Sequence, residues 1–452
     1  MKVLFGGLTQ AHETLISAAV KPLGYEALPL PTPDNEALRI GKEFCNKGQC
    51  NPTYYTVGNL LKFLFKKREE GLEVEREFVF VTAGSCGPCR FGMYEAEYRR
   101  ALKEAGFPDF KVVTFEQARA LTDEQEGPLR FDRRFFLSVI KAVFLGDLIN
   151  DLYYKVKPYE LKEGATDLWK ERALGLLAEA LERGSSVLKA LRRVKRELSA
   201  VRVNYFTPKP KVKITGEFFA QTTEGDGNYR LAAWLIEEGA EPVVEPVATW
   251  IDYLVFVRQL SVKERAFKDR LKAVKELLAL KAFGLYLRSL YELYRRALGG
   301  KPDPLKSQKK LARYAEPYYD PRIAGGEGHM EVGKHVYAVK HKLAHLVVSV
   351  KPFGCMPSTQ SDGVQAKVVE DLKGSLFVSV ETTGDAEANA KSRVLMKLYE
   401  AKELAREEYE RAKRELNLTD RRIEEASKRL ARADLSLPRR YAATAANALL
   451  LV

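Results

Sequence analysis

Hydrophobic and polar positions alternate between two periods in the first quarter of the chain. Short apolar runs typical of strands are separated by longer stretches in which apolar residues recur at helical spacing. The strand candidates are residues 2–5, 25–30, 78–82 and 111–115, and the helix candidates are 12–20, 54–70 and 93–105. This alternation predicts a parallel sheet with crossover helices. The loop at Gly6 and Gly7 and the loop after Thr82 should share the ligand-binding edge of that sheet.

The same alternation resumes after a mainly helical stretch. Residues 132–203 have helical periodicity, and a Pro-containing break at 206–210 follows as a linker. Strand candidates then fall at 211–219, 242–247, 345–352 and 376–381, with helix candidates at 228–238 and 365–372, several helices over 251–313, and a charged helical stretch at 386–432. We therefore predict an α/β protein with two Rossmann-like parallel-sheet subdomains, helical insertions and a long charged C-terminal helical segment.

These patterns divide the chain into four segments. They are an N-terminal α/β subdomain (1–131) carrying Cys45, Cys50, Cys86 and Cys89, a helical connector (132–207), a second α/β subdomain with a helical insertion (208–384) carrying Cys355, and a C-terminal helical segment (385–452). We expect the C-terminal segment to pack a single apolar stripe on the body of the protein; the alternative is a helix that binds a second copy or another partner.

Composition narrows the class of protein. The 452 residues are 46% hydrophobic and 10% aromatic, which supports sizeable cores and excludes a largely disordered chain. The net charge of +13 is spread along the chain without a nucleic-acid-binding motif, so we expect a solvated basic surface and no nucleic-acid partner. Neither a secretory signal nor a membrane-spanning run is recognisable, and we expect a cytoplasmic protein without a membrane partner.

Cysteines carry most of the candidate chemistry. Four of the five lie in Gly- and Pro-containing loops, with the sequences GQCNP, AGSCGPCRFG and KPFGCMPS. Cys86 and Cys355 both follow strong strand candidates, so they should emerge at the carboxyl edges of two different sheets and can meet in a cleft between them. An odd number of cysteines without an export signal is typical of a reduced compartment, where thiols bind metals or do redox chemistry.

Three interpretations of these thiols stay open from spacing alone. Structural zinc uses Cys-x2-Cys but usually takes two such pairs, and the second pair is missing here. Cys86 and Cys89, separated by Gly-Pro, match a thioredoxin dithiol, although Ser85 replaces the usual aromatic residue. Cys45 fits a small buried side chain better than a ligand. The third interpretation is a [4Fe-4S] cluster held by four thiolates from distant loops: Cys50, Cys86, Cys89 and Cys355.

Two Gly-rich segments are further candidates. Residues 222–229, TTEGDGNY, follow a strand and open a helix, so they could bind an anion such as a CoA phosphate or a carboxylate. The alternative is a turn in which Asp226 or Asn228 caps the helix. The segment GGEGH, at 325–329, is either a loop that approaches the cluster or an ordinary connection.

Histidines give weaker signals. His341 and His345 lie four apart on a predicted helix, but the glutamate of an HExxH zinc motif is missing, so we expect surface or packing roles. His12 follows the Gly6-Gly7 loop and could act as a general acid, but a polar residue at a helix start is the commoner explanation.

Five stretches occur in an informative order: GQCNPTYYTVGNLL, TAGSCGPCRFGMYEAEYRRAL, GEFFAQTTEGDGNYRLAAWL, GGEGHMEVGK and KPFGCMPS. Together they resemble the 2-hydroxyacyl-CoA dehydratase and activase-related superfamily, and within it the C-terminal part of the large activase-related proteins. The resemblance spans nearly the whole chain. It implies Rossmann-like subdomains around an oxygen-sensitive iron-sulfur cluster, for which a single [4Fe-4S] cluster is expected, with these ligands by motif: Cys50, Cys86, Cys89 and Cys355.

The resemblance also implies an activity. A separate ATP-hydrolysing activator would supply low-potential electrons, which the cluster would pass to an acyl-CoA or another small substrate, as in a dehydratase or an ATP-coupled reductase component. The chain has no Walker sequence or actin-like phosphate loop, so that activator is expected to be another protein. A dithiol oxidoreductase using Cys86 and Cys89, or a metal-stabilised partner-binding subunit without catalysis, are the alternatives. Either a homo-oligomer or a hetero-oligomer is compatible with the sequence.

Overall fold

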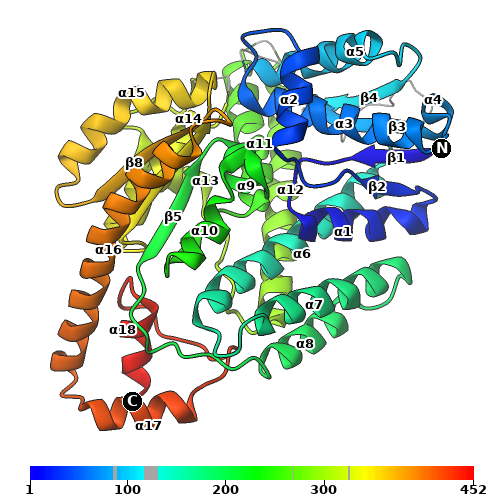
Figure 1. The fold of residues 1–452 in the computed structure, drawn as a ribbon. Helices are drawn as coiled ribbons and strands as arrows, with labels where there is room; N and C mark the ends of the chain where they lie inside the picture. The colour runs from blue at the N-terminus through cyan, green and yellow to red at the C-terminus, as the bar shows by residue number, and fades with distance from the viewer. Residues whose placement is uncertain (85–88, 117–130, 268, 324–325) are drawn as a thin grey trace.

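The computed structural model describes residues 1–84, 89–116, 131–267, 269–323 and 326–452. Two four-stranded sheets, both wholly parallel, form the centres of two α/β units (Figure 1). Their strand orders, β2-β1-β3-β4 and β6-β5-β7-β8, are the same when the strands of each sheet are counted along the chain. The α/β class with two parallel sheets is therefore confirmed.

The first unit is built around strands that are apolar on both faces. In β3, Val79 and Phe80 point to opposite faces and both are buried, as parallel strands covered by helices require. Its strands are β1 (Lys2–Phe5), β2 (Ala27–Pro29), β3 (Phe78–Gly84) and β4 (Lys111–Glu116). Its helices are α1 (Gln10–Val20), η1 (Lys21–Leu23), α2 (Asn35–Phe44), α3 (Asn51–Glu69), α4 (Val74–Glu77), η2 (Arg90–Met93) and α5 (Tyr94–Glu104).

The second unit repeats this arrangement. Its strands are β5 (Lys211–Gly216), β6 (Glu241–Val243), β7 (Leu346–Pro352) and β8 (Leu376–Thr382). Its helices are α9 (Phe218–Thr222), η4 (Asp226–Asn228), α10 (Leu231–Glu237), α13 (Gln308–Ala315), α14 (Gly328–Lys340) and α15 (Met356–Asp371). Its apolar core joins the strands β5, β7 and β8 to α10 and to the long C-terminal helix α16 (Glu387–Glu415).

Several predicted boundaries were wrong. The strand predicted to reach residue 219 ends at Gly216, whose φ of 129° breaks the strand, and α9 starts at Phe218. The strand predicted at 242–247 stops at Val243. The helix predicted at 365–372 begins earlier, at Met356. The prediction missed its first two turns because they are mostly polar and give little apolar periodicity. Helix α2 was not predicted, since small residues such as Ala37 and Gly41 form much of its buried face.

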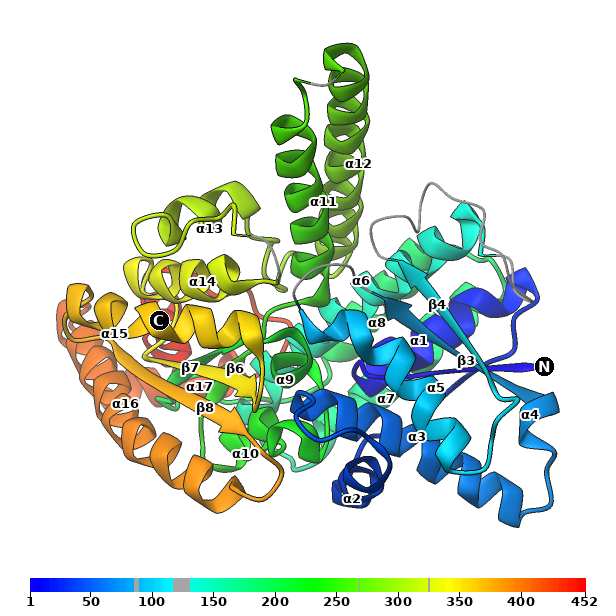
Figure 2. The same ribbon diagram turned by 90° about the horizontal axis from the view of Figure 1, so that it is seen from above.

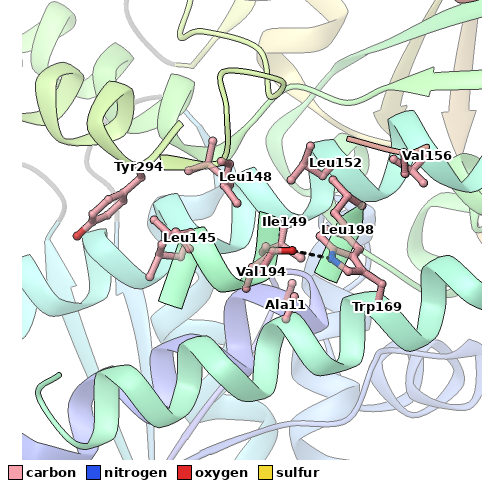
Figure 3. Close-up of a cluster of buried hydrophobic side chains, with 14 of the residues drawn as sticks. Ala11, Leu145, Leu148, Ile149, Leu152, Val156, Trp169, Val194, Leu198 and Tyr294 are labelled. Carbon is pink, nitrogen blue, oxygen red and sulfur yellow. Dashed lines mark hydrogen bonds between the residues drawn. The ribbon is translucent and has the colours of Figure 1, made fainter. Parts of the chain in front are cut away.

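Helices outside the two units form the largest core. The remaining elements are α6 (Arg133–Val156), η3 (Lys157–Tyr159), α7 (Ala165–Glu182), α8 (Val187–Leu198), α11 (Val247–Glu264), α12 (Arg270–Ala297), α17 (Asp420–Arg429), α18 (Thr444–Ala448) and η5 (Leu449–Leu451). Figure 3 shows the centre of this core, where Trp169 on α7 donates to the carbonyl oxygen of Val194 on α8 at 3.2 Å. Among the described residues, no helix is both long enough and apolar enough to cross a membrane.

Lys301, between α12 and α13, makes stability depend on pH. Its amine donates to the Tyr205 hydroxyl at 2.8 Å and to the Leu435 carbonyl at 3.0 Å. Burial, with help from the charge of Lys155, lowers the pKa of Lys301 from 10.5 to about 7. Between these two values the unfolded chain binds more protons, so this group makes the free energy of unfolding rise with pH, by up to about 1.4 kcal/mol per pH unit.

We expect Lys301→Met to flatten that rise. Urea unfolding of the wild type and the variant at several pH values from about 7 to about 9 should give a smaller slope for the variant. Equal slopes for the two proteins would show that the Lys301 amine stays charged in the folded state.

Candidate functional site

Three cysteines occupy the same structural position in three different loops. Cys50, Cys89 and Cys355 are the residues immediately before the first turns of α3, η2 and α15. Cys89 follows β3 and Cys355 follows β7. These two strands are inner strands at equivalent positions of the two sheets. Both cysteines therefore lie beyond the carboxyl ends of strands, where parallel sheets bind ligands.

The three cysteine loops touch one another. The backbone N–H of Asn51 donates to the carbonyl oxygen of Phe353 at 3.0 Å, which joins the Cys50 loop to the Cys355 loop. Arg90 donates to the carbonyl oxygen of Gly354 at 2.8 Å, which joins the Cys89 loop to the same segment. Gly354 has a φ of 77°, and a methyl group there would come within 3.4 Å of the Cys50 Cα atom. The two α/β units therefore meet at their cysteines.

The thiols are enclosed and neutral in the metal-free chain. Cys50 and Cys355 are buried, Cys89 is partly buried, and all three are free of disulfides. The Cys50 sulfur lies 2.9 Å from the Tyr94 hydroxyl, and the Cys355 thiol donates to Ser358 at 3.3 Å. Burial raises the pKa of the Cys89 thiol to about 12 and also raises the pKa values of Cys50 and Cys355. A metal bound here must displace thiol protons.

A partly buried glutamate interacts electrostatically with all three thiols. Glu217 precedes α9, just after β5, and its carboxylate accepts from the Ala220 N–H at 2.9 Å. Its negative charge adds to burial in raising the thiol pKa values of Cys50, Cys89 and Cys355. Burial, followed by the charge of Glu327, raises the pKa of Glu217 itself above that of an ordinary carboxyl.

Two more carboxyl groups, those of Glu327 and Glu331, lie close enough to Glu217 to act on its pKa, and we call the three glutamates the acidic border. Glu327 accepts from the backbone N–H of Phe218 at 2.8 Å, and Glu331 accepts from Ser358 at 2.7 Å and from Ser361. Burial and the charge of Glu327 raise the pKa of Glu331 to about 7. Ser358 thus connects the Cys355 thiol to a carboxyl group that can exchange protons near neutral pH.

Buried lysines lie behind the carboxyl groups. Lys334, on α14, is 2% exposed. Burial lowers its pKa, although the negative charges of Glu245, Glu327 and Glu331 oppose that shift. Lys213 and Lys306 both pair with Glu245, at 2.6 Å and 3.3 Å. Ionisable groups therefore continue from the cysteine site into the second unit.

The predicted ligands are only partly described. Cys50, Cys89 and Cys355 are brought to one place, while Cys86 lies outside the described residues. Within the described ranges, no three Cys, His, Asp or Glu side chains are arranged to hold a metal ion. Cys45 lies in the apolar core at the end of α2, where burial and Glu97 raise its pKa to about 12. The four-ligand set stays a prediction.

The segment 222–229 joins the two units. Glu224 accepts from the Gln10 N–H at 2.8 Å, and Asp226 accepts from the Asn35 N–H at 2.9 Å. Its acidic side chains thus bind the first turns of α1 and α2 rather than capping α10. Asn228 donates to the carbonyl oxygens of Ala220, in α9, and of Thr223.

The histidines take structural positions. His12, 1% exposed, has Nε2 at 3.1 Å from Asp147 and Nδ1 at 2.8 Å from the Thr9 hydroxyl. The prediction that His341 and His345 share a helix is wrong. His341 follows the last residue of α14, and His345 precedes β7. His345 accepts from the Lys211 N–H and lies 3.4 Å from Glu408, so it packs between β5 and α16.

Sequence reasoning missed Glu217 and Glu331. Glu217 follows the strand-ending Gly216, and Glu331 lies one helical turn after Glu327, but neither position distinguishes these residues from ordinary surface glutamates. A scan of the chain against protein-family models gives no match, and a search of curated proteins gives none either.

Proposed function

We propose that the chain is a cytoplasmic iron-sulfur protein of the 2-hydroxyacyl-CoA dehydratase type with two Rossmann-like units. A single [4Fe-4S] cluster would bind Cys50, Cys86, Cys89 and Cys355, accept low-potential electrons from a separate ATP-hydrolysing activator, and pass them to an acyl-CoA or another small substrate. The observation that carries this proposal is the mutual contact of three cysteine loops from two sheets. Iron-sulfur clusters take thiolates from loops of this kind.

The donor set fits iron and sulfide in chemical type. Each of the three described cysteines precedes a helical turn, where unpaired backbone N–H groups and the helix dipole stabilise a thiolate. Loop N–H groups can also donate to cluster sulfurs, which tunes the reduction potential. The carboxyl groups of Glu217, Glu327 and Glu331, where ionised, disfavour the addition of an electron nearby. A centre of low potential is therefore the expected result.

The thiol chemistry favours a metal over dithiol exchange. A dithiol would use only Cys86 and Cys89, whereas the loops of Cys50 and Cys355 also meet at this place. Burial raises the pKa of Cys89 to about 12, so Cys89 itself is unsuited to be the attacking thiol unless a metal stabilises its thiolate. Zinc would also lower that pKa, but three of the proposed ligands come from three separate loops rather than from the two compact pairs of a zinc knuckle.

The test is metal analysis of protein purified without oxygen. We expect about four irons and about four acid-labile sulfides per chain, and an EPR signal after reduction with dithionite. Cys355→Ser should lose or alter that signal, because one iron loses its thiolate. Cys45→Ala is the matched control, since this buried thiol lies in the apolar core, and it should keep the wild-type iron content.

Other outcomes would overturn the proposal. Colourless protein that contains stoichiometric zinc would identify a metal-stabilised subunit. Metal-free protein that reduces a disulfide substrate, with activity lost in Cys89→Ser, would identify the dithiol alternative.

A further inference from the structure

Tyr94 places its hydroxyl beside the sulfur of one proposed ligand. The Tyr94 Oη atom lies 2.9 Å from the Cys50 Sγ atom, within hydrogen-bond distance. Thr53 adds a second hydroxyl, whose Oγ1 atom lies 3.6 Å from the same sulfur. Both Cys50 and Tyr94 are buried, so this contact is formed away from bulk solvent. The nearer of the two hydroxyls comes from a different helix than the cysteine loop it touches.

Packing holds the Tyr94 side chain in this position. Figure 2 shows α3 and α5 on the same side of strands β3 and β4, and their apolar side chains form one core with those strands. Tyr94 is the first residue of α5, is 6% exposed and belongs to that core. The ring of Phe91 packs edge-on against it, with 5.0 Å between ring centroids. A ring enclosed in this way fixes where its hydroxyl points.

Metal binding determines which atom donates. In the metal-free chain either the Cys50 thiol or the Tyr94 hydroxyl can be the donor. A cysteine that binds a metal has lost its proton and can only accept. Burial, followed by the charge of Cys50, raises the pKa of the Tyr94 hydroxyl well above its ordinary value, so Tyr94 keeps its proton. The Tyr94 hydroxyl is therefore the donor once Cys50 is a metal ligand.

A donor at this sulfur favours the reduced state of an iron-sulfur centre. Hydrogen bonds to charged acceptors are stronger than those to neutral ones, and an added electron makes the ligand sulfurs more negative. Hydrogen bonds to cluster sulfurs therefore raise the reduction potential. The acidic border acts in the opposite direction, because its ionised carboxyl groups disfavour the added electron. Tyr94 and the acidic border thus have opposing effects at the same site.

We propose that Tyr94, by donating a hydrogen bond to Cys50, raises the reduction potential of the metal centre and limits how strong a reductant the activator must be. This inference rests on the proposed function, because it requires a cluster at Cys50. Tyr94 acts through Cys50 and does not bind the metal, so it is a positioning residue.

Redox titration of anaerobically purified, full-length protein, followed by EPR, tests this role. Tyr94→Phe removes the hydroxyl and keeps the ring. We expect the iron content of the wild type and a midpoint potential that is more negative. The equilibrium constant for reduction should fall about tenfold, which is about 59 mV for one electron. Thr53→Val should shift the potential in the same direction by less, because its hydroxyl is farther from the sulfur.

Tyr98→Phe is the matched control. Tyr98 is a second buried tyrosine of α5, one helical turn further along, and its ring packs against Phe80 with 4.9 Å between centroids. This variant removes a hydroxyl from the same helix and the same core, and it should keep the wild-type potential. An equal shift in Tyr98→Phe and Tyr94→Phe would contradict the proposal, because the cause would then be a general loosening of the core.

Pulsed EPR of protein reconstituted in H2O and in D2O provides a second measurement. The reduced wild type and Tyr98→Phe should show an exchangeable proton coupling that Tyr94→Phe lacks. Unchanged couplings, or full iron with the wild-type potential in Tyr94→Phe, would overturn the role of Tyr94 and leave the proposed function intact. Loss of iron from Tyr94→Phe would also overturn it, because the hydroxyl would then be needed for assembly. Wild-type protein without a cluster would overturn both.

Discussion

Replacing Asp147 with alanine is expected to lower the free energy of unfolding by about 3–5 kcal/mol, the range for breaking a buried, hydrogen-bonded charge. Asp147 is 4% exposed and accepts three hydrogen bonds. These come from His12 Nε2 at 3.1 Å, from the Val247 N–H at 2.7 Å and from the Ala248 N–H at 2.8 Å. Alanine would leave all three donors buried without this acceptor, at the point where α1, α6 and α11 meet.

Urea unfolding of the metal-free protein measures this loss. Asp320→Ala is the control, because Asp320 forms a solvent-exposed pair with Arg322, and such pairs contribute little to stability. The Asp147 effect should exceed the control effect several-fold. Comparable losses in the two variants would mean that solvent reaches the donors left by Asp147.

The repeated sheet architecture was predictable because local sequence and tertiary burial agree there. β3 and β7 are continuous apolar runs, and parallel strands covered on both faces need that composition. The failures occur where local and tertiary signals diverge. Helix α2, which was not predicted, buries small residues such as Ala37 and Gly41 against α3.

The cysteine loops were recognisable from the sequence, but their acidic border was not. A cysteine between Gly and Pro after a strand has a local signature. In the sequence, Glu217 and Glu331 resemble ordinary charged residues. Only the folding of α9 and α14 against the cysteine loops withdraws these two glutamates from solvent and raises their pKa values. The environment of a carboxyl group depends on distant segments, so its raised pKa has no local sequence signature.

Gly58→Ala should destabilise the first unit by about 3 kcal/mol, at the upper end of the usual cost of overpacking a core. Helices α2 and α3 cross with their backbones in direct contact. A methyl group at Gly58 would overlap the carbonyl oxygen of Ala37, and one at Gly41 would overlap that of Tyr54. Because the obstacle is backbone, relief requires the helices to separate. Cys50 begins α3, so separation should also lower the iron retained by the anaerobically purified protein.

The matched control is the same substitution in another helix. A methyl group at Gly175, exposed on α7, would meet nothing within 4 Å. Gly175→Ala should therefore stabilise the fold by up to about 1 kcal/mol through helix propensity, and should leave the iron content unchanged. Urea unfolding and iron analysis of both variants separate the two effects. If Gly58→Ala matched Gly175→Ala in stability, the close crossing of α2 and α3 would be wrong. Loss of stability with full iron retention would instead show that Cys50 keeps its place independently of that crossing.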